Sequence, residues 1–201
     1  MLEGMHRLNP SKDIRAPITL PLLGQLVTAL SSVCANSYET TLFATAFELA
    51  FFALLRVSEF TVSSRNAVVL LETDIHLLDS EIMVQIKGSK TDQLGKGATI
   101  QIPLNTQTTT LFTHLNQYLS IRPNVSGPFF CHLNAKPLTS YQFTSILHKT
   151  IKFIGLDTTS FKSHSFRIGS ATHMFLQGIP EEEIKIKGRW KSNAVYSYIR
   201  I

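Results

Sequence analysis

The stretch from residue 38 to residue 60, YETTLFATAFELAFFALLRVSEF, decides the fold. Apolar and small residues follow one another almost without a break, and Glu48 is the one charged residue between 40 and 55. A stretch of this length that is apolar on all sides predicts one long, mostly buried helix surrounded by other elements. Arg56 is expected to close that helix, because a cation complements the C-terminal helix dipole, and Glu59 could pair with it.

The sequence before this stretch divides into two parts. Residues 1–18 are polar and interrupted by prolines, as an extension or the remnant of a linker would be. From Thr19 the run TLPLLGQLVTALSSV combines a Thr N-cap, an early proline and apolar residues at helical spacing. We therefore expect a helix there, and a single folded domain over 19–201.

The sequence after it changes from strands back to helices. The runs at 74–79, 81–90 and 98–104 are short, rich in Ile, Val and Leu, and joined by glycine-containing turns, which predicts a small three-stranded antiparallel sheet. Cap-like residues and glycines then delimit helical runs. These runs are 106–121, 138–155, 163–178, 180–188 and 192–200. The expected fold class is α+β, mainly α-helical.

Composition narrows the possible functions. The chain has 201 residues, 44% of them hydrophobic, which suits one well-cored domain. Its net charge of +5 makes an anionic partner such as nucleic acid plausible. Two distant cysteines without a CxxC motif argue against a disulfide framework or structural zinc. The absence of a P-loop, an HExxH motif, a signal peptide and a membrane-spanning run predicts a protein that needs no metal or nucleotide cofactor and is neither secreted nor membrane-bound.

Several polar residues could carry chemistry, although each alone has an ordinary structural explanation. Arg56 and Glu59 could be a helix-end ion pair, Lys90 a solvated residue of a basic hairpin, and Trp190 a core residue. His164 and Arg167 lie one helical turn apart near a helix start, and Tyr196 and Tyr198 belong to the last amphipathic run.

Taken together, these residue types fit one reaction. A phosphodiester transition state needs cations on its non-bridging oxygens, a proton donor for the leaving oxygen, and a nucleophile. Two guanidiniums can clamp the oxygens, a Lys or His can move protons, and a phenol can attack in line. The sequence offers a candidate for each role.

The order of these motifs resembles the catalytic domain of the tyrosine recombinases, or phage integrase family. The matching residues are Arg56-Val57-Ser58-Glu59, Ser89-Lys90-Thr91, His164-Ser165-Phe166-Arg167, Gly188-Arg189-Trp190 and Tyr198-Ile199-Arg200. The resemblance covers the chain from about Thr19. Its SKTDQ and GRW…YIR sequences are similar to those of tyrosine recombinases carried by eukaryotic mobile elements such as Cryptons.

The resemblance implies a role for each residue. Arg56 and Arg167 would hold the scissile phosphate, His164 would act as acid or base, and Lys90 would protonate the leaving 5′ oxygen. Trp190 would supply packing and a hydrogen bond, Glu59 would orient its neighbours, and Tyr198 would form a 3′-phosphotyrosyl link. Arg56, Lys90, His164, Arg167 and Trp190 are expected to line one solvent-open basic cleft. Because Trp190 and Tyr198 are eight residues apart, one fewer than the family pattern, Tyr196 stays a minor alternative nucleophile.

The implied activity is DNA strand cleavage and rejoining, in site-specific recombination or integration, without metal or cofactor. The implied partners are double-stranded DNA and a homo-oligomer formed on it, and the location is nuclear if the host is eukaryotic and otherwise cytoplasmic. The helical core-binding domain that precedes this domain in relatives is not recognisable, so activity is expected when the chain is joined to one. The alternatives are a non-catalytic DNA-binding or interaction module derived from a recombinase and, disfavoured by size, a type IB topoisomerase.

Overall fold

The computed structural model describes residues 14–64, 67–87 and 97–200. Helices and strands follow the order predicted from the sequence, with a three-stranded sheet set between helical halves. The helices are α1 (Leu20–Val33), α2 (Ser37–Phe52), α3 (Val57–Phe60), α4 (Thr109–Ile121), α5 (Ser140–Phe153), α6 (Ser165–Leu176) and α7 (Glu181–Gly188), with short 3₁₀ turns η2 (Glu72–Asp74) and η3 (Asn193–Ser197). The strands are β1 (Ile75–Leu77), β2 (Glu81–Ile86) and β3 (Ala98–Pro103). The predicted α+β, mainly helical class is confirmed.

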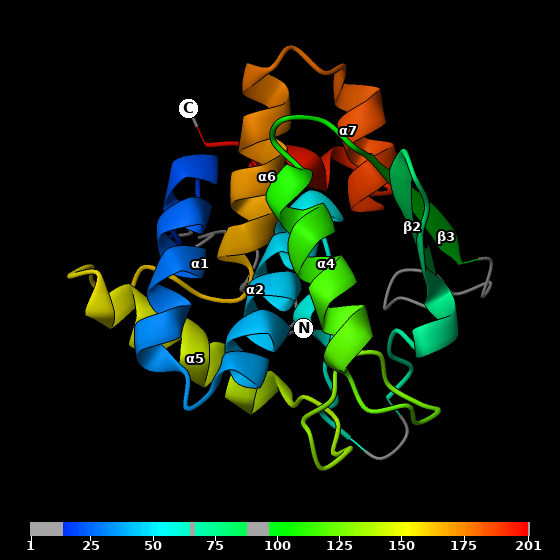
Figure 1. The fold of residues 1–201 in the computed structure, drawn as a ribbon. Coiled ribbons are helices and arrows are strands. Elements are labelled where there is room, and N and C mark those ends of the chain that lie inside the picture. Colours follow the sequence, from blue (N-terminus) through cyan, green and yellow to red (C-terminus); the bar gives the residue numbers. More distant parts are fainter. Residues whose placement is uncertain (1–13, 65–66, 88–96, 201) are drawn as a thin grey trace, which may run out of the picture.

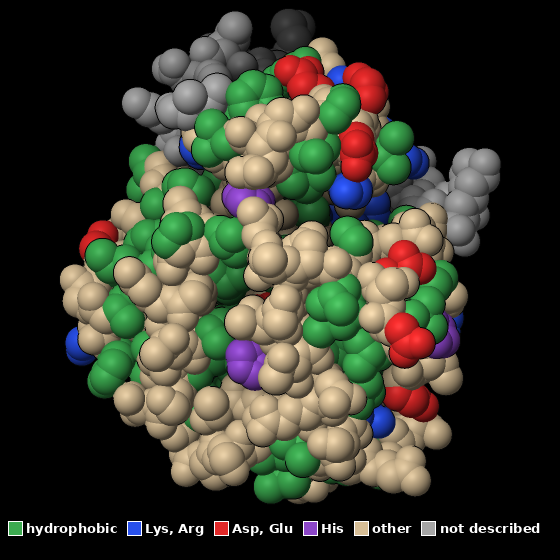
Figure 2. Space-filling view, turned by 45° about the horizontal axis from the view of Figure 1, so that its top comes forward, with side chains coloured by type: hydrophobic (Ala, Val, Ile, Leu, Met, Phe, Trp, Pro, Cys, Tyr) green, Lys and Arg blue, Asp and Glu red, His purple; other side chains and the backbone are tan. Residues whose placement is uncertain are grey.

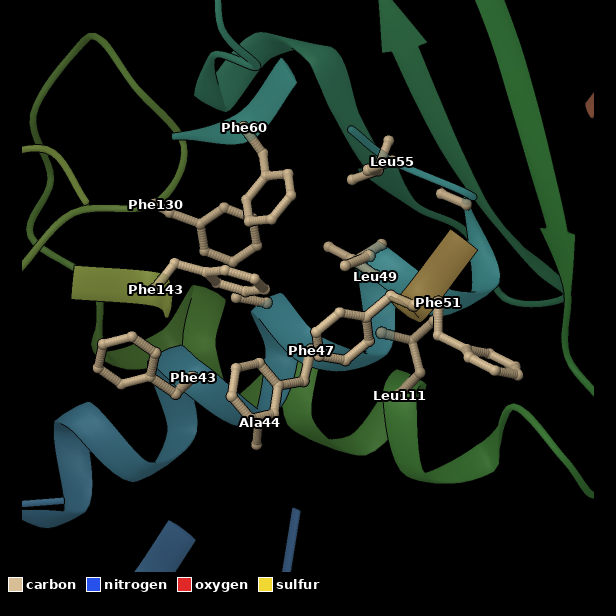
Figure 3. Packing of buried hydrophobic residues seen from close by; sticks show 14 of the residues in the cluster. Phe43, Ala44, Phe47, Leu49, Phe51, Leu55, Phe60, Leu111, Phe130 and Phe143 are labelled. Carbon is tan, nitrogen blue, oxygen red and sulfur yellow. The ribbon is translucent and has the colours of Figure 1, made fainter. Parts of the chain in front are cut away.

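Helix α2 is the centre of the fold. It packs against α1, α4 and α6, while α5 lies against α1 (Figure 1). Its buried phenylalanines meet aromatic rings from the rest of the chain (Figure 3). Phe47 packs edge-on to Phe143 at 5.3 Å between ring centroids, and Phe60 packs on Phe143 at 5.0 Å. The apolar residues between 38 and 55 are therefore mostly buried, as predicted, because other elements cover the helix on several sides.

The sheet is antiparallel, in the order β1-β2-β3. In β2 the buried residues alternate with half-buried ones, so Ile82, Val84 and Ile86 face the core. Their partners Ile102 and Ile100 on β3 are buried on the same face. The sheet lies beside α4, on the side of the bundle away from α1 and α5 (Figure 1).

The end of α2 differs from the prediction. The helix stops at Phe52, and Leu54 takes a left-handed conformation with φ of 46°. The expectation of one helix closed by Arg56 is therefore wrong: Arg56 is the N-cap residue of the separate short helix α3. At this break the Leu54 carbonyl accepts hydrogen bonds from two arginine side chains, as described below.

The helical halves meet closely where α6 passes the start of α1. The Ile18 amide donates a hydrogen bond to the Ser165 carbonyl at 3.0 Å, and Ile18 is fully buried. At Gly169 a Cβ atom would lie 1.7 Å from the Ile18 carbonyl oxygen, so no larger residue fits this crossing. Thr19 caps α1 by accepting a hydrogen bond from the Leu22 amide, as predicted.

Charged side chains are unevenly distributed on the surface. On the face shown in Figure 2 they gather over α7 and the sheet side, while the middle is largely uncharged. On α7, Lys185 and Lys187 form ion pairs with Glu182 and Glu183. Among the described residues, no helix is long and apolar enough to span a membrane.

A buried ion pair joins α2 to α4 and makes stability depend on pH. His114 Nδ1 lies 2.8 Å from Oε2 of Glu48, whose side chain is 3% exposed. The hydrogen bond with Glu48 raises the pKa of His114 above its ordinary 6.5, against the opposing effect of burial. Protonated His114 therefore stabilises the fold at low pH, and this contribution is lost as pH rises through the folded-state pKa.

We expect the free energy of unfolding to fall as pH rises from the ordinary histidine pKa of 6.5 through the raised folded-state pKa of His114. His114→Gln keeps a hydrogen-bond donor but cannot titrate, so its unfolding free energy should change less over the same range. Urea denaturation at several pH values would measure both. Equal pH dependence in the two proteins would contradict this account of the ion pair.

Candidate active site

Arg167 is the innermost residue of the candidate site. It lies in the first turn of α6, and none of its surface reaches solvent. Its Nη1 donates to the Leu54 carbonyl, and its Nη2 donates to the Gly188 carbonyl at 2.9 Å. Two main-chain oxygens thus hold this guanidinium, one just after α2 and one at the end of α7. The first belongs to Leu54, which lies 113 residues from Arg167 in the sequence.

Two aromatic rings cover the Arg167 guanidinium. Its central carbon lies 4.7 Å from the Trp190 ring and 5.5 Å from the Tyr198 ring. The two rings are themselves 4.7 Å apart. Cation–π attraction is stronger where water is excluded, so this stack stabilises the buried charge. The Trp190 ring lies over Gly188, where a Cβ atom would be 1.8 Å from the ring.

A second layer of the site is built around Glu59. The Arg56 side chain donates to Oε1 of Glu59 at 2.9 Å, and its main-chain amide donates to Oε2 at 2.8 Å. Arg189 binds Oε2 from the other side at 2.7 Å and also donates to the Leu54 carbonyl at 2.9 Å. Two arginines thus bind one buried carboxylate, and with the nearby Arg167 the group has a net charge of about +2 if each is ionised as usual.

His164 and Tyr198 face each other across the site. His164 is the N-cap residue of α6, and its Nε2 lies 2.8 Å from the Tyr198 hydroxyl. The two rings are 5.5 Å apart. The predicted one-turn spacing of His164 and Arg167 therefore places both beside the same phenol, one at the hydroxyl and the other over the ring.

Tyr196 points elsewhere. Its hydroxyl donates to Oε2 of Glu181 at 2.6 Å, and its side chain is exposed beside Lys185. Tyr196 lies in the 3₁₀ turn η3 and Tyr198 is the C-cap residue that follows it, so this segment is not the α-helix that the sequence predicts. Even so, residues two apart on such a turn face different directions, and Tyr198 is the one directed at Arg167.

Electrostatics and unmet hydrogen bonds mark the site as a place for an anion. Burial, reinforced by Arg189 and Arg56, lowers the pKa of Arg167 to about 9, so the guanidinium is still protonated at neutral pH. Buried Nε atoms of Arg167 and Arg189, and Nε1 of Trp190, lack a hydrogen-bond partner among the described residues. Buried donors are nearly always paired, so the unpaired donors of Arg167 and Trp190, which lie together beside Tyr198, call for an acceptor from outside.

The structure therefore brings together most of the residues singled out from the sequence. Arg56, Glu59, His164, Arg167, Trp190 and Tyr198 share one network, whereas Lys90 lies outside the described residues. The expectation of a solvent-open cleft is wrong for Arg167, because the Trp190 and Tyr198 rings cover it. Sequence reasoning gave no role to Arg189. The signal that could have pointed to Arg189 is its place between Gly188 and Trp190 in the GRW motif.

No group of three or more His, Cys, Asp or Glu residues close enough to hold a metal ion occurs in the part of the chain that the structure describes.

Comparison with known proteins agrees with this arrangement. The family model described as the phage integrase family matches residues 22–199. The chain belongs to the phage integrase family, the tyrosine recombinases. Among curated protein sequences no relative was found.

Solved tyrosine recombinases share the fold at low sequence identity. XerH bound to a palindromic difH substrate in a post-cleavage complex superposes with a TM-score of 0.75 at 16% identity, over 98% of this chain and 54% of that one. A lambda integrase dimer bound to a COC′ core site gives 0.64 at 19% identity, over 92% and 48%. XerA recombinase gives 0.69 at 15%, over 96% and 61%. The chain thus spans about half the length of the XerH and lambda integrase chains.

The contact between Gly188 and Trp190 can be tested directly. In Gly188→Ala the new methyl group would collide with the indole ring, so Trp190 must leave its place over Arg167. Overpacking of this kind costs about 1–3 kcal/mol. We expect a lower melting temperature and a changed fluorescence spectrum, which Trp190 dominates as the one tryptophan of the chain.

Gly24→Ala is the matched control. It lies on the exposed side of α1 with no atom within 4 Å of a new Cβ. It should raise helix stability by about 0.5–1 kcal/mol and leave the fluorescence unchanged. An unchanged Trp190 spectrum in Gly188→Ala would show that the indole does not depend on this contact.

Proposed function

We propose that this domain cleaves and rejoins DNA strands through a 3′-phosphotyrosine intermediate formed on Tyr198. The observation that carries the proposal is the 2.8 Å contact between His164 Nε2 and the Tyr198 hydroxyl, beside the buried guanidinium of Arg167. This is the arrangement of a nucleophile, its base and a fixed positive charge. Site-specific recombination or DNA integration is the class of reaction it would serve.

The cleavage step balances without a cofactor. Neutral His164, with Nε2 unprotonated, accepts the Tyr198 hydroxyl proton, and the phenolate oxygen attacks the scissile phosphorus. A bond forms between Oη and phosphorus as the bond to the 5′ oxygen breaks. The leaving oxygen takes a proton, for which Lys90 is the candidate donor by family resemblance. Attack by a 5′ hydroxyl of another strand reverses these steps, so the phosphodiester energy is conserved.

The cationic group supplies transition-state stabilisation. A phosphodiester carries one negative charge, and a second develops as the phenolate oxygen attacks. The arginine cluster with Glu59 has a net charge of about +2 with ordinary ionisation, which matches that change. The unpaired Nε of Arg167 can donate to a phosphate oxygen, and Arg56, partly open to solvent, can donate to another.

Substrate entry requires a local rearrangement. Arg167 has no exposed surface, and the Tyr198 ring covers part of it. For the phosphate to lie between the guanidinium and the hydroxyl, the ring must shift while η3 stays attached to α7. Double-stranded DNA is the proposed partner, with assembly of more than one copy on it. Lambda integrase has been solved as a dimer bound to a COC′ core site.

The function is tested by trapping the intermediate. The chain, alone or joined to a core-binding domain, is incubated with a pool of labelled, nicked duplexes of random sequence, and covalent adducts are resolved on a denaturing gel. We expect an adduct with the unaltered protein and none with Tyr198→Phe, which lacks the nucleophile. Arg167→Ala should reduce adduct formation on the order of 10²-fold or more, because it removes transition-state charge stabilisation.

Tyr196→Phe is the matched control, since it removes a nearby phenol that faces Glu181 instead of the site. It should form the adduct at close to the normal rate. An adduct that persists in Tyr198→Phe but disappears in Tyr196→Phe would overturn the nucleophile assignment. DNA binding without any adduct would instead favour a non-catalytic module derived from a recombinase.

A further inference from the structure

The main chain at Arg189 is in a conformation that glycine normally occupies. Arg189 has φ of 57° and ψ of 40°, in the left-handed region, directly after α7. A residue with a Cβ costs roughly 1–2 kcal/mol there relative to right-handed conformations, whereas glycine costs little. A long charged side chain at this position therefore has to be retained by the contacts it makes.

Those contacts tie α7 to the break after α2. The Arg189 side chain is 8% exposed. Its Nη2 donates to Oε2 of Glu59 at 2.7 Å and to the Leu54 carbonyl at 2.9 Å, and its Nη1 donates to the Lys187 carbonyl at 3.0 Å. Leu54 is itself left-handed, and its carbonyl also receives Arg167. Two strained main-chain positions thus meet at one hydrogen bond inside the site.

We propose that Arg189 is a positioning residue for the cleavage reaction, acting through Glu59 and the Leu54 carbonyl. The inference rests on the proposed function. Both Nη atoms of Arg189 are engaged by protein oxygens, so the side chain works on its neighbours. By taking one oxygen of Glu59 it keeps that carboxylate from neutralising Arg56 alone, which leaves Arg56 more positive toward a phosphate.

The second effect of Arg189 is on the position of the Arg167 side chain. The Leu54 carbonyl is fixed by two guanidiniums, and the one from Arg189 arrives from α7, whose last residue also receives Arg167. Without Arg189, the α2–α3 connection loses its direct side-chain link to α7. Arg167 and Arg56 would then be less well aligned, and misplacement by about 1 Å can cost about 10²-fold in rate.

Arg189→Gly separates the side chain from the main-chain strain. Glycine accepts the left-handed conformation, so a purely conformational role predicts a protein at least as stable and as active as the original. Our proposal predicts that adduct formation slows by about 10²-fold. DNA affinity should be unchanged within about twofold, because the proposed phosphate contacts come from Arg167 and Arg56, whereas both Nη atoms of Arg189 donate to protein oxygens.

A rescue experiment and a control variant test whether the slower rate comes from the missing Arg189 side chain. Guanidinium chloride at low millimolar concentration should restore part of the lost rate in Arg189→Gly, because the free ion can occupy the vacated site, while the same concentration of sodium chloride should not. Ala135→Gly is the matched control: Ala135 is also left-handed, with φ of 63°, but lies in the turn between His132 and Lys136. It should leave the rate unchanged and should not respond to guanidinium.

The outcomes distinguish this inference from the function on which it rests. An adduct that forms equally fast in Arg189→Gly and in the unaltered protein overturns the positioning role alone. A slow variant that also loses DNA affinity and gains nothing from guanidinium overturns it too, since general unfolding explains that result. No adduct from the unaltered protein on the random pool overturns the proposed function and this inference with it.

Discussion

Arg167 places a permanent positive charge where water does not reach it, and removing an ion from water costs several kcal/mol unless the protein replaces its hydration. Here two main-chain carbonyls and two aromatic rings do so. None of these partners belongs to α6, the helix that carries Arg167. The charge can therefore be buried only when the end of α2, the end of α7 and η3 are all in place.

Local irregularities of the fold follow from that requirement. The Leu54 carbonyl can bind Arg167 because α2 stops before it, and the break also starts α3 with Arg56 and Glu59 in the site. The Gly188 carbonyl accepts a hydrogen bond from Arg167, and the missing side chain of Gly188 leaves room for the Trp190 ring. The contacts that bury the Arg167 guanidinium thus also position Arg56, Glu59 and Trp190. Folding and assembly of the site are therefore one process.

Periodicity and turn chemistry predicted the element order, since long apolar runs, capping residues and glycines act locally. They could not predict the break at Leu54, because the sequence there is uniformly apolar and the side chain that binds the Leu54 carbonyl lies 113 residues away. Family resemblance named Arg56, His164, Arg167, Trp190 and Tyr198, which the structure groups together. It missed Arg189, whose importance depends on a left-handed main chain, and it did not anticipate that rings would cover Arg167.

The proposed mechanism requires the Tyr198 phenol, which His164 holds over Arg167, to become covalently joined to DNA. Its most direct test is to digest the isolated protein–DNA adduct with nuclease and protease and to locate the remaining nucleotide by peptide mass spectrometry. The account predicts a nucleotide linked through phosphate to Tyr198. A nucleotide on Tyr196 or on any other residue would contradict it.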